Sequence, residues 1–174
     1  MISTLNLERI AQNAGSEISE SLTYSARLAK FSGIPANLHP DVEKRIKSLY
    51  PNGLYTHQAK AIALGLEGRS VCVATPTASG KTLTFSAIAI SSLLSNQGTT
   101  ILALYPAKAL LHDQERKWED AARGTGLKIT VIDGGVEVSQ RTARLAQAQI
   151  ILMTPDVLHA WLMSKLDQTE FVLF

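Results

Sequence analysis

Residues 70–82 have the sequence SVCVATPTASGKT. Ser70 to Ala74 are small or apolar and predict a buried strand, and the small residues after them predict a turn that ends in Gly80-Lys81-Thr82 and opens a helix. Such a loop supplies converging backbone N–H groups, a lysine that reaches phosphate oxygens and a hydroxyl for Mg²⁺. Thr75 stands where the general pattern has its first glycine, but the last three residues carry most of this chemistry. We therefore predict a triphosphate-binding loop.

The composition is that of a chain with one domain-sized core. Its 174 residues are 45% hydrophobic, which supports a single ordinary domain. The 17 basic and 15 acidic residues give a net charge of +2. Charge this close to balance does not by itself indicate a nucleic-acid-binding protein, so any such prediction has to come from motifs.

The single cysteine, the four histidines and the lengths of the apolar segments argue against redox, metal-binding and membrane proteins. The single cysteine, Cys72, lies in an apolar run and is predicted to be a buried side chain in a reducing compartment. The four histidines lack metal-ligand spacing, so we expect no metal held by protein side chains alone. We find neither an apolar segment long enough to span a bilayer nor a signal-peptide pattern, and expect a soluble cytoplasmic protein without a membrane partner.

Strand and helix patterns alternate four times along the chain. After the strand at 70–74, apolar runs predict strands at 99–105, 127–132 and 149–153, with helices at 83–95, 109–122, 141–147 and 155–165 between and after them. This order predicts an α/β fold with a parallel sheet and flanking helices. Loosely spaced apolar residues before Gly33 predict short helices, so we assign residues 1–37 to a small helical appendage.

A set of ordered motifs resembles the front of the superfamily 2 helicases of the DEAD/DEAH-box type. The motifs are LYTHQ (54–58), ATPTASGKT (74–82), YPAKALLHDQ (105–114), DGG (133–135) and TPDVLH (154–159). Within that superfamily they are most similar to the bacterial MrfA-type helicases of DNA repair and their relatives in anti-phage defence. The resemblance covers residues 38–174 and implies a partial RecA-like lobe, which is a P-loop NTPase fold.

The resemblance implies an ATP site with Mg²⁺. Gln58 corresponds to the glutamine that recognises adenine, because an amide can both donate and accept hydrogen bonds, although it could also be a solvated residue at a helix start. Tyr50 and Tyr55 are candidates to stack on the base, or simply packing residues. Lys81 and Thr82 are the predicted catalytic residues, with Thr82 as the Mg²⁺ ligand, and the other predicted loop contacts are Thr77, Ala78, Ser79 and Gly80.

Three further motifs imply contacts with a nucleic-acid backbone. The start of the helix after Pro106 would meet a phosphate through Lys108 and the amide of Ala109, although Lys108 could also be a solvated charge. Ala107 stands where the family usually has threonine. The other implied contacts are Gly134, Gly135, Thr154, Pro155 and Asp156, of which the last could simply cap a helix. The resemblance favours DNA over RNA and implies a second RecA-like lobe and other subunits of a repair or defence complex as partners.

The acidic motif that holds Mg²⁺ and polarises water in this family is not found, since no Asp-Glu pair follows Thr82. We therefore expect a lobe truncated before that motif, as part of an ATP-dependent helicase or translocase, and a chain that binds ATP without hydrolysing it or unwinding nucleic acid. One alternative is a short protein that senses ATP or docks on a partner without turnover. Another is a P-loop kinase in which Asp133 organises Mg²⁺.

Overall fold

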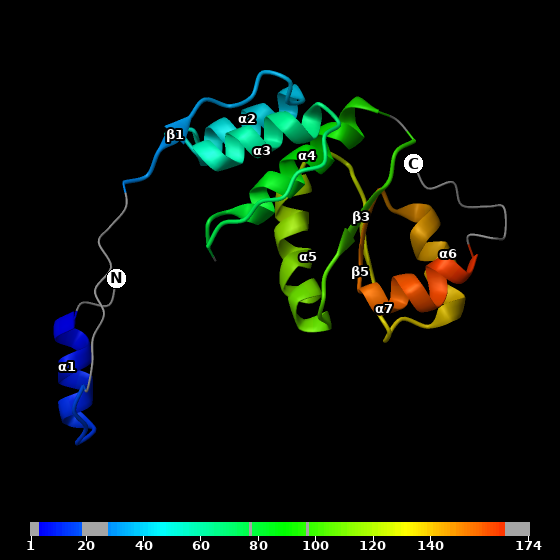
Figure 1. Ribbon diagram of the computed structural model, residues 1–174. Coiled ribbons are helices and arrows are strands. Elements are labelled where there is room, and N and C mark those ends of the chain that lie inside the picture. Colours follow the sequence, from blue (N-terminus) through cyan, green and yellow to red (C-terminus); the bar gives the residue numbers. More distant parts are fainter. Residues whose placement is uncertain (1–3, 19–27, 77, 97, 166–174) are drawn as a thin grey trace.

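The computed structural model describes residues 4–18, 28–76, 78–96 and 98–165 (Figure 1). The elements are α1 (Thr4–Asn13), β1 (Phe31–Ser32), α2 (Pro40–Leu49), β2 (Leu54–Tyr55), α3 (Thr56–Leu66), α4 (Lys81–Ser95), β3 (Ile101–Leu104), α5 (Lys108–Ala122), β4 (Ile129–Ile132), α6 (Val138–Gln147), β5 (Ile150–Met153), α7 (Pro155–Val157), a π-helical turn η1 (Leu158–Leu162) and a 3-10 turn η2 (Met163–Lys165). Across these ranges, no helix has both the length and the apolar character needed to cross a membrane.

A parallel sheet with the strand order β3-β5-β4 forms the centre of the fold. Ile150 of β5 pairs with Ile101 of β3 on one side and with Ile129 of β4 on the other. All four residues of β5 are buried, as expected for the central strand of a sheet covered on both faces. The predicted α/β fold with a parallel sheet and flanking helices is confirmed.

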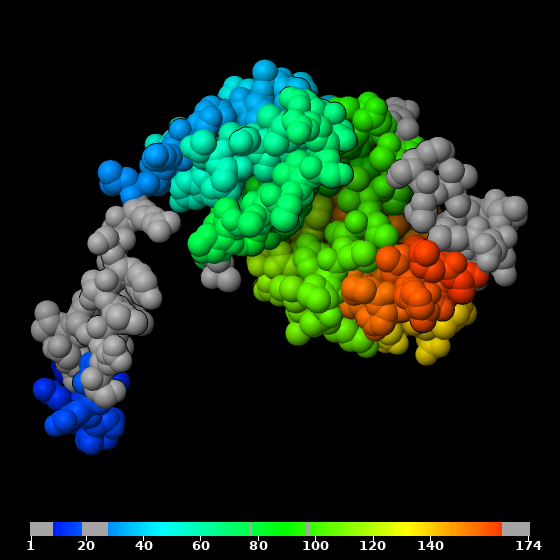
Figure 2. All heavy atoms as spheres, in the orientation of Figure 1, coloured from blue at the N-terminus to red at the C-terminus, as the bar shows by residue number. Residues whose placement is uncertain are grey.

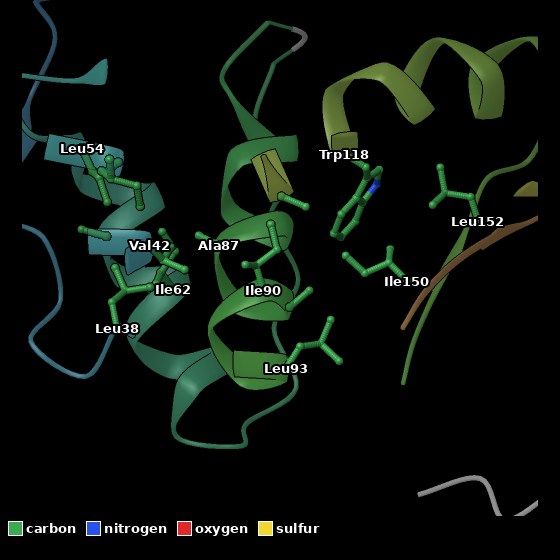
Figure 3. Packing of buried hydrophobic residues seen from close by; sticks show 14 of the residues in the cluster. Leu38, Val42, Leu54, Ile62, Ala87, Ile90, Leu93, Trp118, Ile150 and Leu152 are labelled. Carbon is green, nitrogen blue, oxygen red and sulfur yellow. The ribbon is translucent and has the colours of Figure 1, made fainter. Parts of the chain in front are cut away.

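The side chains of β5 alternate between two hydrophobic clusters. Ile150 and Leu152 join the larger cluster with α2, α3, α4 and α5, which Figure 3 shows around Ile90 and Trp118. Ile151 and Met153 join a smaller cluster with α7 and η1. This alternation is the period of two of a β-strand, and it places a helical layer against each face of the sheet.

The predicted buried strand at 70–74 is wrong. Residues 69–76 have no strand assignment, Val71 and Val73 are half-buried, and Cys72 is exposed. A strand is stabilised by hydrogen bonds to a neighbour, and in the described part of the chain the sheet consists of β3, β5 and β4 without a partner for this stretch. An apolar run alone therefore did not determine a strand here.

β3 lies at an edge of the described sheet and borders a groove of about 270 Å³. Residues of α4, β3 and α5 line this groove, together with Tyr105: Phe85, Ala89, Ile101, Leu102, Ala103, Leu104 and Trp118. Leu104 and Phe85 are 44% and 46% exposed. At this edge the backbone of β3 has no further strand beside it among the described residues, and an apolar groove lies next to it.

The stretch assigned to the N-terminal appendage is helical only in part. In Figures 1 and 2, α1 lies away from the rest of the chain. By contrast, β1 pairs with β2 in an antiparallel ribbon, and the N–H of Thr56 donates to the carbonyl of Lys30 at 3.0 Å. Residues 30–32 therefore lie against the lobe, while the other predicted helical positions at 19–27 fall outside the described residues.

Other predicted elements differ mainly at their ends. The three strands of the sheet are shorter than their apolar runs, and α6 begins at Val138 instead of Arg141. The predicted helix at 155–165 exists as a continuous helical stretch of three types, α7, η1 and η2. Element ends depend on capping contacts that apolar periodicity does not specify.

Candidate nucleotide and nucleic-acid site

The predicted phosphate loop, residues 75–80 with Thr77 outside the described residues, leads into α4, which begins at Lys81, two residues before the predicted helix at 83–95. Two residues have positive φ, Ala78 at 60° and the N-cap Gly80 at 77°. Thr75 Oγ1 and Ser79 Oγ are hydrogen-bonded at 2.6 Å across the loop. The first N–H groups of a helix have no intrahelical acceptor, so the start of α4 offers free donors and the positive end of the helix dipole to an anion.

The Lys81 ammonium is held at the loop itself. Its Nζ donates to the carbonyls of Thr75 at 2.8 Å and Pro76 at 2.7 Å. Thr82 follows it at the start of α4, and its Oγ1 donates to Gln114 Oε1 of α5 at 3.0 Å. The predicted Thr77 lies outside the described residues. The loop amides, the lysine charge and the threonine hydroxyl are therefore adjacent, which fits a triphosphate with Mg²⁺.

Gln58 packs directly against this loop. It is 4% exposed, and its Nε2 donates to the carbonyls of Ser79 at 3.4 Å and Gly80 at 3.2 Å. Its Oε1 accepts from the N–H of Tyr55 at 3.0 Å. An amide has two N–H donors and two acceptor lone pairs. One lone pair of Oε1 remains for an exocyclic amine such as that of adenine.

The tight packing of Gln58 predicts a specific cost for a Cβ at Gly80. In Gly80→Ala the new carbon would lie 2.3 Å from Gln58 Nε2, on a backbone with φ of 77°. Gly68→Ala is the matched control, since its φ is 76° and nothing lies within 4 Å. Both variants carry the left-handed strain of about 1–2 kcal/mol. We expect Gly80→Ala to lower the free energy of unfolding by a further ~1–3 kcal/mol because Gln58 loses its hydrogen bonds.

Urea unfolding followed by circular dichroism measures both free energies. Equal losses in the two alanine variants would contradict the contact between Gln58 and the loop.

Three aromatic rings form a column beside the loop. Tyr55 stacks on Phe31 at a centroid distance of 5.3 Å and on His57 at 5.8 Å. His57 Nε2 lies 3.1 Å from the carbonyl of Ser79, which ties the column to the phosphate loop. Tyr50, the other predicted stacking residue, is 41% exposed at the end of α2. The sequence did not reveal Phe31, because no local spacing connects residue 31 to residue 55. His57 lies within the motif LYTHQ, but nothing in that motif indicated that its ring stacks on Tyr55.

The predicted phosphate-contacting turns gather at one end of the sheet. The strands β3, β5 and β4 are parallel, and Leu104 and Ile132 are both in register with Met153. The segments that follow these strands therefore begin at the same end of the sheet, where the strands have their carboxyl ends. These segments contain the predicted residues Pro106, Lys108, Ala109, Gly134, Gly135, Thr154, Pro155 and Asp156. These segments thus form a surface across the carboxyl ends of three neighbouring strands.

Lys108 and the glycine turn are in close proximity. A Cβ at Gly134 would lie 3.3 Å from Lys108 Nζ. Asp133, which is 7% exposed, accepts from the N–H of Gly135 at 2.7 Å, and its Oδ2 lies 3.1 Å from His112 Nε2 of α5. Asp133 therefore fixes the turn against the start of α5. Among the described residues, no hydrogen bond or ion pair joins Asp133 to the predicted phosphate loop, so its position does not favour the P-loop kinase alternative.

The remaining turn begins at Thr154, which is the N-cap of α7 and is buried. Its Oγ1 has no hydrogen-bond partner among the described residues. Asp156 is exposed in the first turn of this helix, where a carboxylate interacts favourably with the helix dipole. A stabilising role in the helix and a position at the strand ends are compatible for this residue.

The environment of Asp133 predicts a pH dependence of stability. Burial raises the pKa of Asp133, but the N–H of Gly135, His112 and the charge of Lys108 lower it, and the pKa of this carboxyl lies below its usual value. Because the folded pKa is the lower one, protons favour the unfolded state as the pH falls. The stability that Asp133 contributes is present above the ordinary value of 3.8 and is lost below it.

We therefore expect wild type and Asp133→Asn to differ most in the free energy of unfolding near neutral pH and to converge as the pH falls below about 4. Urea unfolding at a series of pH values measures the difference. Glu119→Gln, which removes an exposed carboxylate from the same helix as His112, is the control. A constant difference between wild type and Asp133→Asn across pH would contradict the lowered pKa of the Asp133 carboxyl.

Residues 55–174 match the family model for the DEAD/DEAH box helicase. The chain is 32% identical over 148 residues to the ATP-dependent helicase HRQ1 of Saccharomyces cerevisiae, which covers 83% of this chain and 14% of that protein. It is 29% identical over 136 residues to the uncharacterized ATP-dependent helicase YprA of Bacillus subtilis, covering 77% of this chain and 18% of that protein. The chain thus spans less than a fifth of these curated relatives.

Solved structures show the same likeness. The crystal structure of the DUF1998 helicase MrfA bound to DNA and AMPPNP superposes with a TM-score of 0.73 and 29% identity, covering 79% of this chain and 20% of that one. The Mycobacterium smegmatis helicase Lhr, bound to single-stranded DNA and AMP-PNP, gives a TM-score of 0.65 and 28% identity, covering 77% of this chain and 19% of that one. The predicted resemblance to the MrfA-type helicases is confirmed.

Proposed function

Because this chain belongs to the DEAD/DEAH box helicase family, we propose that residues 38–174 form the ATP-binding part of the first RecA-like lobe of an ATP-dependent helicase or translocase. We assign residues 1–37 to an N-terminal appendage of this lobe. The observation that carries the proposal is the common helix α5. Its Gln114 accepts from Thr82 at 3.0 Å, and its His112 lies 3.1 Å from Asp133 at the glycine turn. A nucleotide site and a nucleic-acid surface thus share one rigid element.

In the nucleotide site, the start of α4 and the loop amides bind the phosphates, and Lys81 neutralises their charge. Thr82 would offer its hydroxyl oxygen to Mg²⁺, which would supply positive charge to the phosphates. Gln58 accepts from the adenine amine with its remaining lone pair, and Tyr55 lies in the aromatic column beside it. Ala78, Ser79 and Gly80 shape the loop around the phosphates.

In the nucleic-acid surface, the contacts go to phosphate groups and do not read bases. The N–H groups at the start of α5 and the Lys108 charge bind one phosphate, and the two other turns at the strand ends continue the track. The crystal structure of MrfA bound to DNA and the structure of Lhr bound to single-stranded DNA support DNA as the nucleic acid. The likeness to MrfA supports a role in repair or defence. A cytoplasmic location and other subunits of a complex are further parts of this proposal.

Hydrolysis needs groups beyond those found after Thr82. The sequence after Thr82 contains no Asp-Glu pair to hold Mg²⁺ and polarise water, and a second RecA-like lobe would supply arginines for the transition state. We propose that the 174-residue chain binds ATP without turnover. Translocation along a nucleic-acid strand is then an activity of the whole protein, in which ATP binding closes two lobes and hydrolysis reopens them.

Calorimetric titration of the chain with ATP and with GTP, in the presence of Mg²⁺, tests the proposal. We expect binding of ATP and no phosphate release with or without single-stranded DNA. Binding of GTP should be weaker, because guanine has a carbonyl oxygen at the position where adenine presents its amine to Gln58 Oε1. Fluorescence anisotropy with a labelled single strand measures the second surface, and the affinity should fall as salt increases. A chain that binds neither ATP nor the strand would contradict the proposal, and phosphate release would contradict the absence of turnover.

A further inference from the structure

Gln114 of α5 connects the phosphate loop to a neighbouring charged pair. Its side chain is 6% exposed, and its Oε1 accepts from Thr82 Oγ1 at 3.0 Å. Its Nε2 donates to Asp113 Oδ2 at 2.9 Å. The same carboxylate oxygen accepts from Lys117 Nζ at 2.7 Å. A chain of hydrogen bonds therefore runs from Lys117 through Asp113 and Gln114 to Thr82.

The carboxylate of Asp113 determines the orientation of the Gln114 side-chain amide. Lys117 donates to Asp113 and lowers the pKa of this exposed carboxyl, which is therefore ionised at neutral pH. An ionised carboxylate only accepts hydrogen bonds, so the Gln114 amide must present its nitrogen to Asp113. Its oxygen then faces Thr82, and two acceptors cannot bond to each other. The Thr82 hydroxyl must be the donor in this contact.

The direction of that proton has a consequence for a bound cation. A hydroxyl has one proton and two lone pairs, and a metal ion binds the lone pairs. When the proton points to Gln114, the lone pairs of Thr82 Oγ1 stay on the side of the phosphate loop. A hydroxyl free to rotate would present its proton to the cation for part of the time, so a fixed acceptor favours coordination.

We propose that Gln114 is a positioning residue for Mg²⁺: it accepts the proton of Thr82 and thereby holds the lone pairs of that hydroxyl toward the metal that accompanies ATP. This inference rests on the proposed function, since it assumes that Thr82 binds Mg²⁺ with a nucleotide. Gln114 itself touches neither the nucleotide nor the metal. Partners of this kind, one step removed from the metal, orient its ligands and raise their affinity.

Gln114→Met tests the assignment, because methionine has similar length and volume but accepts no strong hydrogen bond. ATP affinity is measured by calorimetry with saturating Mg²⁺ and with EDTA, for wild type and variant. We expect a loss of about 10- to 100-fold in the presence of Mg²⁺ and a change of less than about twofold in EDTA. A merely structural role lowers both affinities equally, and either that result or an unchanged affinity in Mg²⁺ would overturn the proposal.

Two further variants complete the test. In a Thr82→Ala background, Gln114→Met should have no further effect on the Mg²⁺ dependence, because the shared interaction is already lost. Where Gln114→Met fails to fold, Gln114→Asn is used instead, since it keeps the amide but shortens the side chain by one carbon. We expect this variant to lose the same Mg²⁺-dependent part of the ATP affinity. An effect of Gln114→Met that persists without the Thr82 hydroxyl would count against the proposal.

The wild-type chain separates this inference from the proposed function. A wild-type chain that does not bind ATP contradicts the proposed function and the inference with it. A wild-type chain that binds ATP more tightly with Mg²⁺ than with EDTA, and whose Gln114→Met variant does the same to the same extent, contradicts the inference alone.

Discussion

Lys81→Ala is expected to reduce the affinity of the chain for ATP in the presence of Mg²⁺ by about 100-fold or more, since truncating one partner of a hydrogen-bonded charge pair costs ~2–5 kcal/mol. The Lys81 ammonium donates to the carbonyls of Thr75 and Pro76. Both are neutral acceptors, so phosphate oxygens are the stronger partners for this charge. Removal of the ammonium should therefore affect binding far more than folding.

Calorimetric titration measures the affinity, and urea unfolding shows whether the fold is retained. Lys47→Ala is the matched control, because Lys47 also lies on a helix and its side chain is 64% exposed in an i,i+4 pair with Glu43. We expect this control to leave the ATP affinity within about twofold, since exposed pairs of this kind contribute little. An ATP affinity that is the same in Lys81→Ala as in wild type would disprove the nucleotide site at this loop.

Trp118→Ala is expected to lower the free energy of unfolding by about 3–5 kcal/mol. Trp118 is 2% exposed and lies between α4 and the sheet, near Ile90 and Ile150 (Figure 3). Its Nε1 also donates to the hydroxyl of Tyr105 at 2.8 Å, so the substitution leaves a cavity and an unpaired phenol. A loss of this size is a large share of the ~5–15 kcal/mol typical of a whole domain.

Urea unfolding followed by far-ultraviolet circular dichroism measures this loss without relying on tryptophan fluorescence. Trp118→Phe is the control, since it keeps most of the ring volume and removes the hydrogen bond to Tyr105. We expect a smaller loss of about 1–3 kcal/mol for it. If both substitutions cost the same, cavity formation is not the main effect and the packing argument fails.

Local sequence patterns predicted the elements whose signals are local. The apolar runs that form β3, β4 and β5 are bounded by glycine, proline or polar residues, and the start of α4 follows from Gly80-Lys81-Thr82. Each of these signals lies within a few neighbouring residues. The alternation of the runs then favoured a parallel sheet, which the structure contains.

The errors and omissions concern contacts between distant parts of the chain. The stretch at 70–74 has a strand-like composition, but a strand needs a hydrogen-bonded neighbour and composition does not supply one. Gln114 contacts Thr82 over 32 positions, and Phe31 stacks on Tyr55 from the other strand of a short ribbon. Neither pair has a characteristic spacing, because the fold and not the local pattern brings them together.

In the described part of the chain β3 is an edge strand, which has a consequence for the behaviour of the chain in solution. Unpaired N–H and C=O groups along an edge strand are a template on which a strand of another molecule can add. Here the apolar groove beside Leu104 and Phe85 would reward such pairing with hydrophobic burial. We therefore expect any self-association at this edge to increase with protein concentration, so dilute samples are the suitable ones for measuring the affinities and unfolding free energies of the chain.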